Sequence, residues 1–84
     1  MKSVTIYSTM MCPYCSAAKN LLSRKGVKYD EIDVTFAPGT RSDMTRRAGG
    51  KRSVPQIFSG DDHVGGCDEL HALEHAGKLD PMLK

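Results

Sequence analysis

Two cysteines with a two-residue spacing, Cys12-Pro13-Tyr14-Cys15, are the residues best suited to chemistry. A C-x-x-C pair at the start of a helix is typical of redox proteins. The unpaired N–H groups and the dipole at a helix N-terminus stabilise a thiolate, and only a thiolate attacks a disulfide. We therefore expect Cys12 to be the nucleophile. Cys15, one turn into the helix and close enough to form a disulfide with Cys12, is expected to be the resolving thiol.

The same cysteine pair is also half of a zinc-binding knuckle. The other two ligands would be His71 and His75, whose spacing suits one face of a helix. More than fifty residues separate these histidines from the cysteines, whereas about a dozen do so in a compact zinc finger. The histidines are more simply explained as the polar flank of a helix, and we expect no metal.

The first third of the chain contains the elements that must position the cysteine pair. Residues 2–8 are rich in β-favouring side chains and predict a short strand. Pro13 is favoured at the first position of a helix, and Gly26 is typical of a helix end. Between them, four apolar residues have the spacing of one helix face: Ala17, Ala18, Leu21 and Leu22. We predict a strand, a tight turn and a helix.

The middle of the chain continues this alternation. Residues 27–34 predict a second strand, and a strand–helix–strand unit of this length favours a parallel pair. Residues 36–40, around Pro38 and Gly39, predict a turn. A weaker helix is expected to follow and to end at residues 49–50, where two glycines occur.

The last third predicts a hairpin and a helix. The third strand is expected over residues 54–59 and a short fourth strand at residues 63–64, with a turn between them. A final helix would place three residues on its inner face and end at Gly77: Leu70, Leu73 and Ala76. The predicted element order is βαβαββα, in one domain over residues 1–84.

Length and composition limit the class of protein. A chain of 84 residues with 39% apolar and 26% charged residues predicts one small globular domain. The net charge of +2 is too small to indicate a nucleic-acid partner. Residues 41–52 contain five basic residues and one acidic residue, and residues 61–84 contain six acidic and two basic ones. An anion site is therefore expected near the middle third. No aromatic residues interleave with the basic cluster, so nucleic acid is not expected to bind it.

The expected location is the cytoplasm. No apolar stretch approaches the roughly 20 residues that a membrane helix needs, and residues 1–11 lack the pattern of a signal peptide. Three cysteines without a secretory segment make a disulfide scaffold unsuitable, because a reducing compartment keeps such bridges open.

The whole chain resembles the glutaredoxins, specifically the small bacterial dithiol type. The matching segments are CPYC at 12–15, SVPQIF at 53–58, GGCD at 65–68 and LDPMLK at 79–84. The resemblance implies an α/β thioredoxin-like fold with a four-stranded mixed sheet flanked by helices. It also implies the reduction of protein disulfides and glutathione mixed disulfides, with glutathione as co-substrate and electron donor.

The resemblance further implies a glutathione site. Pro55 resembles the family's cis-proline, which would leave the backbone of Val54 free to pair with the backbone of glutathione. Gly66 would allow a close approach of the ligand. The N–H groups of Cys67 and Asp68 would bind the γ-glutamyl carboxylate, and the Asp68 side chain would meet the adjacent ammonium. Alternatively, Pro55 simply opens a strand and Asp68 is a first-turn acid favoured by the helix dipole.

Three more residues complete the expected site. Lys51 is the best candidate to bind the glycine carboxylate of glutathione, with Arg41 and Arg52 behind it. Tyr14 is expected to expose its ring and line the groove. Alternatively, its side chain only fills space and has no part in binding. Cys67 resembles an extra cysteine of some glutaredoxins, and we expect a buried thiol without a catalytic role.

One position departs from the family pattern. Glutaredoxins usually have a lysine three residues before the nucleophilic cysteine, and here this position is Thr9. Cys12 then depends more on the helix N-terminus, and glutathione is expected to bind less tightly. Met10 and Met11 add apolar surface rather than charge.

Two related functions remain as alternatives. A thioredoxin-like reductase that takes electrons from a flavoenzyme would share the fold without needing Lys51, Val54 and Asp68. A cluster-binding glutaredoxin would use Cys12 and glutathione to hold a 2Fe–2S cluster, and Pro13 argues against it by resemblance to the dithiol class. The expected partners are glutathione and glutathionylated or disulfide-containing proteins, with no membrane partner. A monomer is the default because the nucleophile must be exposed.

Overall fold

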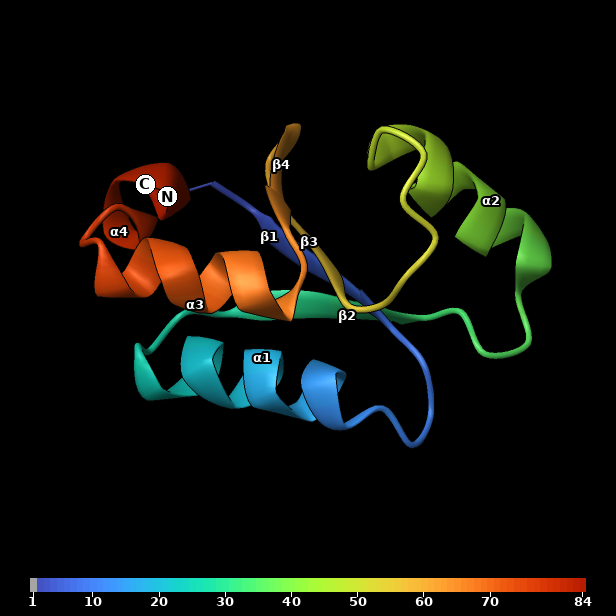
Figure 1. Cartoon of the computed structure of the whole chain (residues 1–84), viewed down its shortest axis with the longest axis horizontal. Coiled ribbons are helices and arrows are strands. Elements are labelled where there is room, and N and C mark those ends of the chain that lie inside the picture. The colour runs from blue at the N-terminus through green and yellow to red at the C-terminus, as the bar shows by residue number, and fades with distance from the viewer. Residues whose placement is uncertain (1) are drawn as a thin grey trace.

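Four strands and four helices form residues 2–84, which are the residues described by the computed structural model (Figure 1). The strands are β1 (Val4–Ser8), β2 (Tyr29–Asp33), β3 (Gln56–Ser59) and β4 (Asp62–Gly65). The helices are α1 (Pro13–Arg24), α2 (Pro38–Arg47), α3 (Cys67–His75) and α4 (Leu79–Leu83). Within residues 2–84, no helix is both long and apolar enough to cross a membrane.

The four strands form one mixed sheet in the order β2-β1-β3-β4. β1 pairs with β2 in parallel, with Ser8 opposite Asp33 at the carboxyl ends of the two strands. β1 and β3 are antiparallel, with Ile6 opposite Ile57, and β3 forms an antiparallel hairpin with β4. The mixed four-stranded sheet and the parallel first pair are confirmed.

Apolar side chains cover both faces of this sheet, because alternate residues of a strand point to opposite faces. One face packs Ile6 and Ile57 against apolar residues of α1, α3 and α4. The other face packs Tyr7 and Phe58 against α2. Figure 1 shows α1 and α3 side by side and α2 apart from them. The packed sheet thus fixes the position of the loop that follows β1.

Helix α1 has the start and end that the sequence predicts. Pro13 occupies the first turn, and the stripe of buried residues consists of Cys15, Ala18, Leu21 and Leu22. At the other end Gly26 has a φ of 73°. The Val27 N–H donates to the Leu22 carbonyl at 3.0 Å, which closes the helix C-terminus.

Most boundaries differ from the prediction by a few residues, among them the starts of α2, β2 and β3. α2 begins at Pro38, inside the expected turn, because proline is favoured in a first helical turn and the Arg41 N–H already donates to the Ala37 carbonyl at 2.9 Å. β2 begins at Tyr29 rather than at residue 27. β3 begins at Gln56, two residues later than expected, because the preceding Val54–Pro55 segment leaves the sheet.

The C-terminal end differs most. A short helix, α4, follows the glycine turn at Gly77 and was not predicted, so the element order is βαβαββαα. Leu79 and Leu83 of α4 are buried in the core, which explains why the segment folds back. Ala76, expected on the inner face of α3, is exposed because it is the C-cap of that helix.

Candidate active site

The turn between β1 and α1 places the two cysteines at different depths. Cys12 is the half-buried N-cap of α1, and its Sγ accepts a hydrogen bond from the Cys15 N–H at 3.1 Å. Cys15 is 1% exposed. The two sulfurs lie at disulfide distance, with Cα atoms 5.2 Å apart, inside the usual range for a disulfide. Cys12 is therefore the sulfur of the pair that an incoming molecule reaches more easily.

A cis peptide bond between Val54 and Pro55 lies beside the cysteine pair. The cis geometry is the one implied by the family resemblance, whereas the sequence alone favours trans. The Val54 carbonyl oxygen is 3.9 Å from the Cys12 Sγ. Val54 precedes β3 and pairs with no strand within residues 2–84, so its backbone groups lie outside the sheet, next to the nucleophile.

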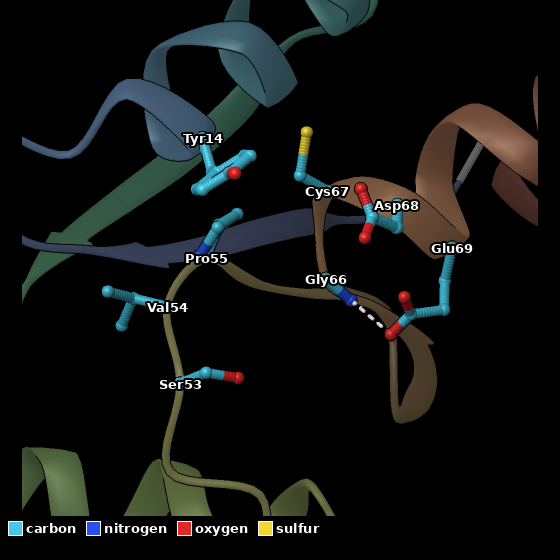
Figure 2. A pocket seen from close by; sticks show the side chains of 8 residues that line it. All are labelled: Tyr14, Ser53, Val54, Pro55, Gly66, Cys67, Asp68 and Glu69. Atoms are coloured by element: carbon cyan, nitrogen blue, oxygen red, sulfur yellow. Dashed lines mark hydrogen bonds between the residues drawn. The ribbon is translucent and has the colours of Figure 1, made fainter.

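A pocket opens beside this proline (Figure 2). Figure 2 shows Tyr14, Val54 and Pro55 on one side of it and Asp68 and Glu69 on the other. The complete lining consists of Tyr14, Ser53, Val54, Pro55, Gly66, Cys67, Asp68 and Glu69. Six of the seven residues predicted to bind glutathione therefore lie in one pocket, and Lys51 is the exception.

Two glycines bring the start of α3 close to the cis-proline. Gly65 has a φ of +123°, and a Cβ there would lie 2.7 Å from the Glu69 Cβ. A Cβ at Gly66 would lie 3.2 Å from the Pro55 carbonyl oxygen. The Glu69 carboxylate accepts a hydrogen bond from the Gly66 N–H at 3.1 Å. The next N–H groups, those of Cys67 and Asp68, open the helix at the pocket wall.

Lys51 lies at the rim of the pocket, next to an acid. Its Nζ is 3.7 Å from the Glu69 Oε1, and both side chains are about half exposed. The hydrogen bond from the Gly66 N–H, with a smaller contribution from Lys51, holds the pKa of Glu69 below its usual value. The two arginines expected behind Lys51 do not line the pocket, and Arg41 donates instead to the Arg52 carbonyl at 3.0 Å.

Cys67 differs from the expected buried thiol, because it is half-buried and lines the pocket. Its Sγ lies 3.5 Å from the His71 Nδ1, which also lies 2.8 Å from the Cys67 carbonyl oxygen. Burial raises the pKa of this thiol, and the negative charges of Asp68 and Glu69 raise it further. Cys67 is thus kept in the less reactive thiol form.

Sequence reasoning missed two residues of the pocket, Ser53 and Glu69. Glu69 had a detectable signal, because an acid three residues after a helix N-cap is the second half of a capping box. Ser53 had none, since its place follows from the path of the chain before the cis bond. Among residues 2–84, no three His, Cys, Asp or Glu side chains lie close enough together to hold a metal ion.

The family model described as glutaredoxin matches residues 4–64. The chain belongs to the glutaredoxin family. Glutaredoxin of Pseudomonas aeruginosa is 55% identical over 83 residues, covering 99% of this chain and 98% of the relative. Glutaredoxin 3 of Escherichia coli K12 is 48% identical over 84 residues and the full length of both chains. The buckwheat glutaredoxin–glutathione complex is similar in structure, with a TM-score of 0.86 and 33% identity over 98% of this chain and 76% of that one.

These findings confirm the family, the thioredoxin-like fold and the class of enzyme. Glutaredoxins are thiol–disulfide oxidoreductases that use glutathione as a substrate, and one of the similar structures is a complex with glutathione. In this glutaredoxin the two cysteines lie at disulfide distance.

Proposed function

We propose that this glutaredoxin reduces glutathionylated proteins and protein disulfides, with Cys12 as nucleophile and Cys15 as resolving thiol. The observation behind these roles is the difference in depth. Cys12 caps α1 next to an open pocket, whereas Cys15 is 1% exposed and within disulfide reach of it. The external substrate therefore meets Cys12 first.

With a glutathionylated protein, the Cys12 thiolate attacks the glutathione sulfur. A bond forms between these two sulfurs, the bond from glutathione to the protein breaks, and the protein leaves as a thiolate that takes up a proton. A second glutathione thiolate then attacks the glutathione sulfur on Cys12. This step releases glutathione disulfide and restores the Cys12 thiolate, so one free glutathione is consumed as reductant for each protein thiol that is regained.

With a protein disulfide, the Cys12 thiolate attacks one protein sulfur and displaces the other. The Cys15 thiolate next attacks the Sγ of Cys12, frees the second protein thiol and leaves a Cys12–Cys15 disulfide. Two glutathione molecules then reduce this disulfide and become glutathione disulfide. The Cα separation of 5.2 Å allows this internal step without a movement of the backbone.

The thiolate of Cys12 is stabilised by the end of α1. The Cys15 N–H points at the Cys12 Sγ, and the dipole of a twelve-residue helix adds a partial positive charge. Thr9 supplies no charge where relatives of this family usually have a lysine. The backbone is accordingly the main source of activation.

The pocket lined by the cis-proline and the start of α3 binds glutathione in this proposal. The backbone of Val54 pairs with the cysteine of glutathione, as an added strand of one residue. The N–H groups of Cys67 and Asp68 bind the γ-glutamyl carboxylate, and the Asp68 side chain meets the ammonium. Lys51 turns from Glu69 towards the glycine carboxylate.

The remaining pocket residues shape the site around the ligand. Tyr14, which is 65% exposed, and Pro55 form one wall, and Gly66 permits the close approach of the other. The buckwheat glutaredoxin, whose structure contains glutathione, supports this placement by its similar fold.

We further propose one domain over residues 1–84 that acts as a cytoplasmic monomer without a metal. One sheet with both faces covered supports the single domain. Access to Cys12 requires that no second copy cover it. A compartment rich in reduced glutathione is needed to regenerate the thiols, which favours the cytoplasm over an oxidising location. Nucleic acids and membranes are not expected as partners.

The proposal is tested by glutathione-dependent reduction of a glutathionylated peptide with three proteins. Wild type should be active, Cys12→Ser inactive and Cys15→Ser still substantially active, while Cys15→Ser should lose reduction of a protein disulfide. Activity retained in Cys12→Ser would refute its role as nucleophile. A wild type that accepts electrons from a flavoenzyme reductase but not from glutathione would favour the thioredoxin-like alternative. A visible absorbance band in fresh protein would favour the cluster-binding one.

A further inference from the structure

The exposed large hydrophobic side chains of this glutaredoxin gather at the active site. Four such side chains occur among residues 2–84, and Tyr14 of the pocket is one of them. The other three are Met10 at 59%, Met11 at 97% and Phe36 at 89% exposure. We call Met10, Met11 and Phe36 the apolar rim. None of the three lines the glutathione pocket.

The residues of the apolar rim lie on two loops that leave the same end of the sheet. β1 and β2 are parallel, with Ser8 opposite Asp33, so the loops that follow them start side by side. The Met10 N–H donates to the Thr35 Oγ1 at 2.8 Å and joins the two loops. Figure 1 shows both loops beyond the start of α1, at the end of the molecule where Cys12 lies.

The loop that contains Phe36 is itself held in place. The Asp33 Oδ1 accepts hydrogen bonds from the Thr35 N–H at 2.8 Å and from the Thr35 Oγ1 at 2.6 Å. Thr35 therefore links the end of β2 to the loop that contains Met10. Because Thr35 directly precedes Phe36, these hydrogen bonds also hold the backbone next to Phe36 in place. The three apolar side chains are presented from a defined backbone rather than from a free loop.

Met11 is exposed at a conformational cost. Its φ of 53° makes it the only non-glycine residue with a positive φ among residues 2–84. The left-handed region disfavours residues with a side chain, and a long apolar side chain at 97% exposure gains nothing from packing within the chain. Such outliers cluster at functional sites, and apolar patches of this kind mark interaction surfaces.

We propose that the apolar rim is the docking surface for the polypeptide of protein substrates, and that it selects an apolar side chain next to the substrate cysteine. This inference rests on the proposed function. Met11 directly precedes Cys12, so an occupant of the rim lies against the nucleophile. A second copy or a permanent partner bound at the apolar rim would block access to Cys12. A protein substrate, in contrast, must come to this surface in order to react with Cys12.

The rim should distinguish protein substrates from small disulfides. Glutathione binds in the pocket beside Pro55, whereas the protein half of a mixed disulfide needs a second surface. A small leaving thiol does not extend to the rim and gains nothing from it. Replacement of a rim residue should thus lower kcat/KM only for polypeptides with an apolar residue near the cysteine.

The test compares three glutathione mixed disulfides: a peptide with leucines flanking its cysteine, the same peptide with serines, and 2-mercaptoethanol. Met11→Asn suits the test because asparagine tolerates the left-handed region, so the loop should fold. Met11→Asn and Phe36→Ser should each lower kcat/KM for the leucine peptide roughly tenfold, the factor expected from losing the burial of one apolar side chain. The other two substrates should change less than twofold, and the matched control Phe36→Leu should retain activity on all three.

Two results would overturn the inference. Equal losses on all three substrates would show that the variants disturb the reaction centre, and an unchanged rate on the leucine peptide would show that nothing docks on the rim. Sedimentation adds a third: a wild-type dimer that Phe36→Ser dissociates would assign the rim to a second copy. Turnover of the 2-mercaptoethanol mixed disulfide by wild type tests the proposed function separately, since this substrate does not use the rim.

Discussion

At the scale of single residues, the hydrogen-bonding groups next to the Cys12 sulfur belong to the backbone. The Cys15 N–H donates to the Cys12 Sγ at 3.1 Å, and the Val54 carbonyl oxygen lies 3.9 Å away. Position 9 is a threonine and adds no positive charge. Charged side chains instead lie on one side of the pocket, where Asp68 and Glu69 line the wall and Lys51 contacts Glu69. In the proposed site, a carboxylate of glutathione therefore competes with Glu69 for Lys51.

Replacing Glu69 by glutamine should strengthen the binding of glutathione. Glutamine still accepts the hydrogen bond from the Gly66 N–H, but it no longer holds Lys51 by charge or repels a carboxylate. Because an exposed ion pair contributes about 0.2–1 kcal/mol, the KM for glutathione should fall roughly two- to fivefold. Steady-state rates at varied glutathione measure this change.

The matched variant is Lys51→Ala, which removes the cation and should raise the KM for glutathione by a similar factor. If Glu69→Gln raises that KM instead, the acid supports the pocket rather than competing for Lys51. An unchanged KM in Lys51→Ala would exclude Lys51 from the glutathione site.

At this scale the redox cysteine pair was predictable from its spacing, and most of the pocket lining from the resemblance to the glutaredoxins. Cys12, Cys15 and the glycines before α3 each match a known local motif. The pairing of Lys51 with Glu69 was not predictable, since it depends on how the loop before Pro55 meets the start of α3. The half-buried position of Cys67 depends on the same approach.

At the scale of elements, the pocket exists because α3 starts very close to the cis-proline. Gly65 makes this start possible, since a φ of +123° and the contact with Glu69 leave no room for a Cβ. Sequence periodicity predicted the long helices and the sheet well, because α1 has a continuous buried stripe. It missed α4, which has five residues and a proline inside and is ordered by the burial of its two leucines.

Gly65→Ala should therefore damage both stability and glutathione binding. The substitution forces an alanine into a disfavoured φ and against the Glu69 side chain, which should cost about 2 kcal/mol of unfolding free energy. The KM for glutathione should rise, because the N–H groups at the start of α3 shift. Urea unfolding and steady-state kinetics measure the two effects.

Gly39→Ala is the matched control. Gly39 lies in the first turn of α2, and a Cβ there meets nothing within 4 Å. Alanine at a helical position without a clash should stabilise the protein by about 0.5–1 kcal/mol and leave the kinetics unchanged. Equal effects of the two substitutions would contradict the special role of the turn before α3.

At the scale of the whole molecule, one acid joins three elements beneath the active-site turn. The Glu31 Oε2 on β2 accepts hydrogen bonds from the Ser8 hydroxyl at the end of β1 (2.6 Å) and from the Lys19 ammonium on α1 (2.9 Å). The Ser8 bond is the main cause that holds the pKa of Glu31 below its usual value of 4.5, and the Lys19 bond adds to it. Ser8 is 1% exposed, so this link is partly inside the fold.

Stability should thus decrease in acid. A carboxyl whose pKa is lower in the folded state contributes stability above its unfolded pKa, and this contribution is lost as the pH falls through the folded value. The unfolding free energy should be level near neutral pH and should fall once the pH drops below about 4.5. In Glu31→Gln, the decrease of the unfolding free energy with falling pH should be smaller than in wild type. The difference should be less than about 1 kcal/mol, because the Glu31 side chain is partly exposed. Urea unfolding from pH 7 to pH 3 measures it, and identical acid profiles for the two proteins would contradict the role of Glu31.

The arrangement of the whole molecule was only partly predictable from the sequence. The βαβ start and the hairpin follow from local patterns, and they place Cys12 at the end of β1 beside the strand that starts after Pro55. The junction of the two loops through Met10 and Thr35 does not follow from any local pattern. It depends on parallel strands that end at the same edge.

The central claim, that Cys12 takes glutathione from the substrate, is tested most directly by trapping the intermediate. Cys15→Ser is mixed with a glutathionylated peptide in the absence of free glutathione, quenched with acid and analysed by peptide mass spectrometry. The account predicts one glutathione on Cys12, free thiol at Cys67 and released peptide. Glutathione on Cys67, or peptide instead of glutathione on Cys12, would contradict it.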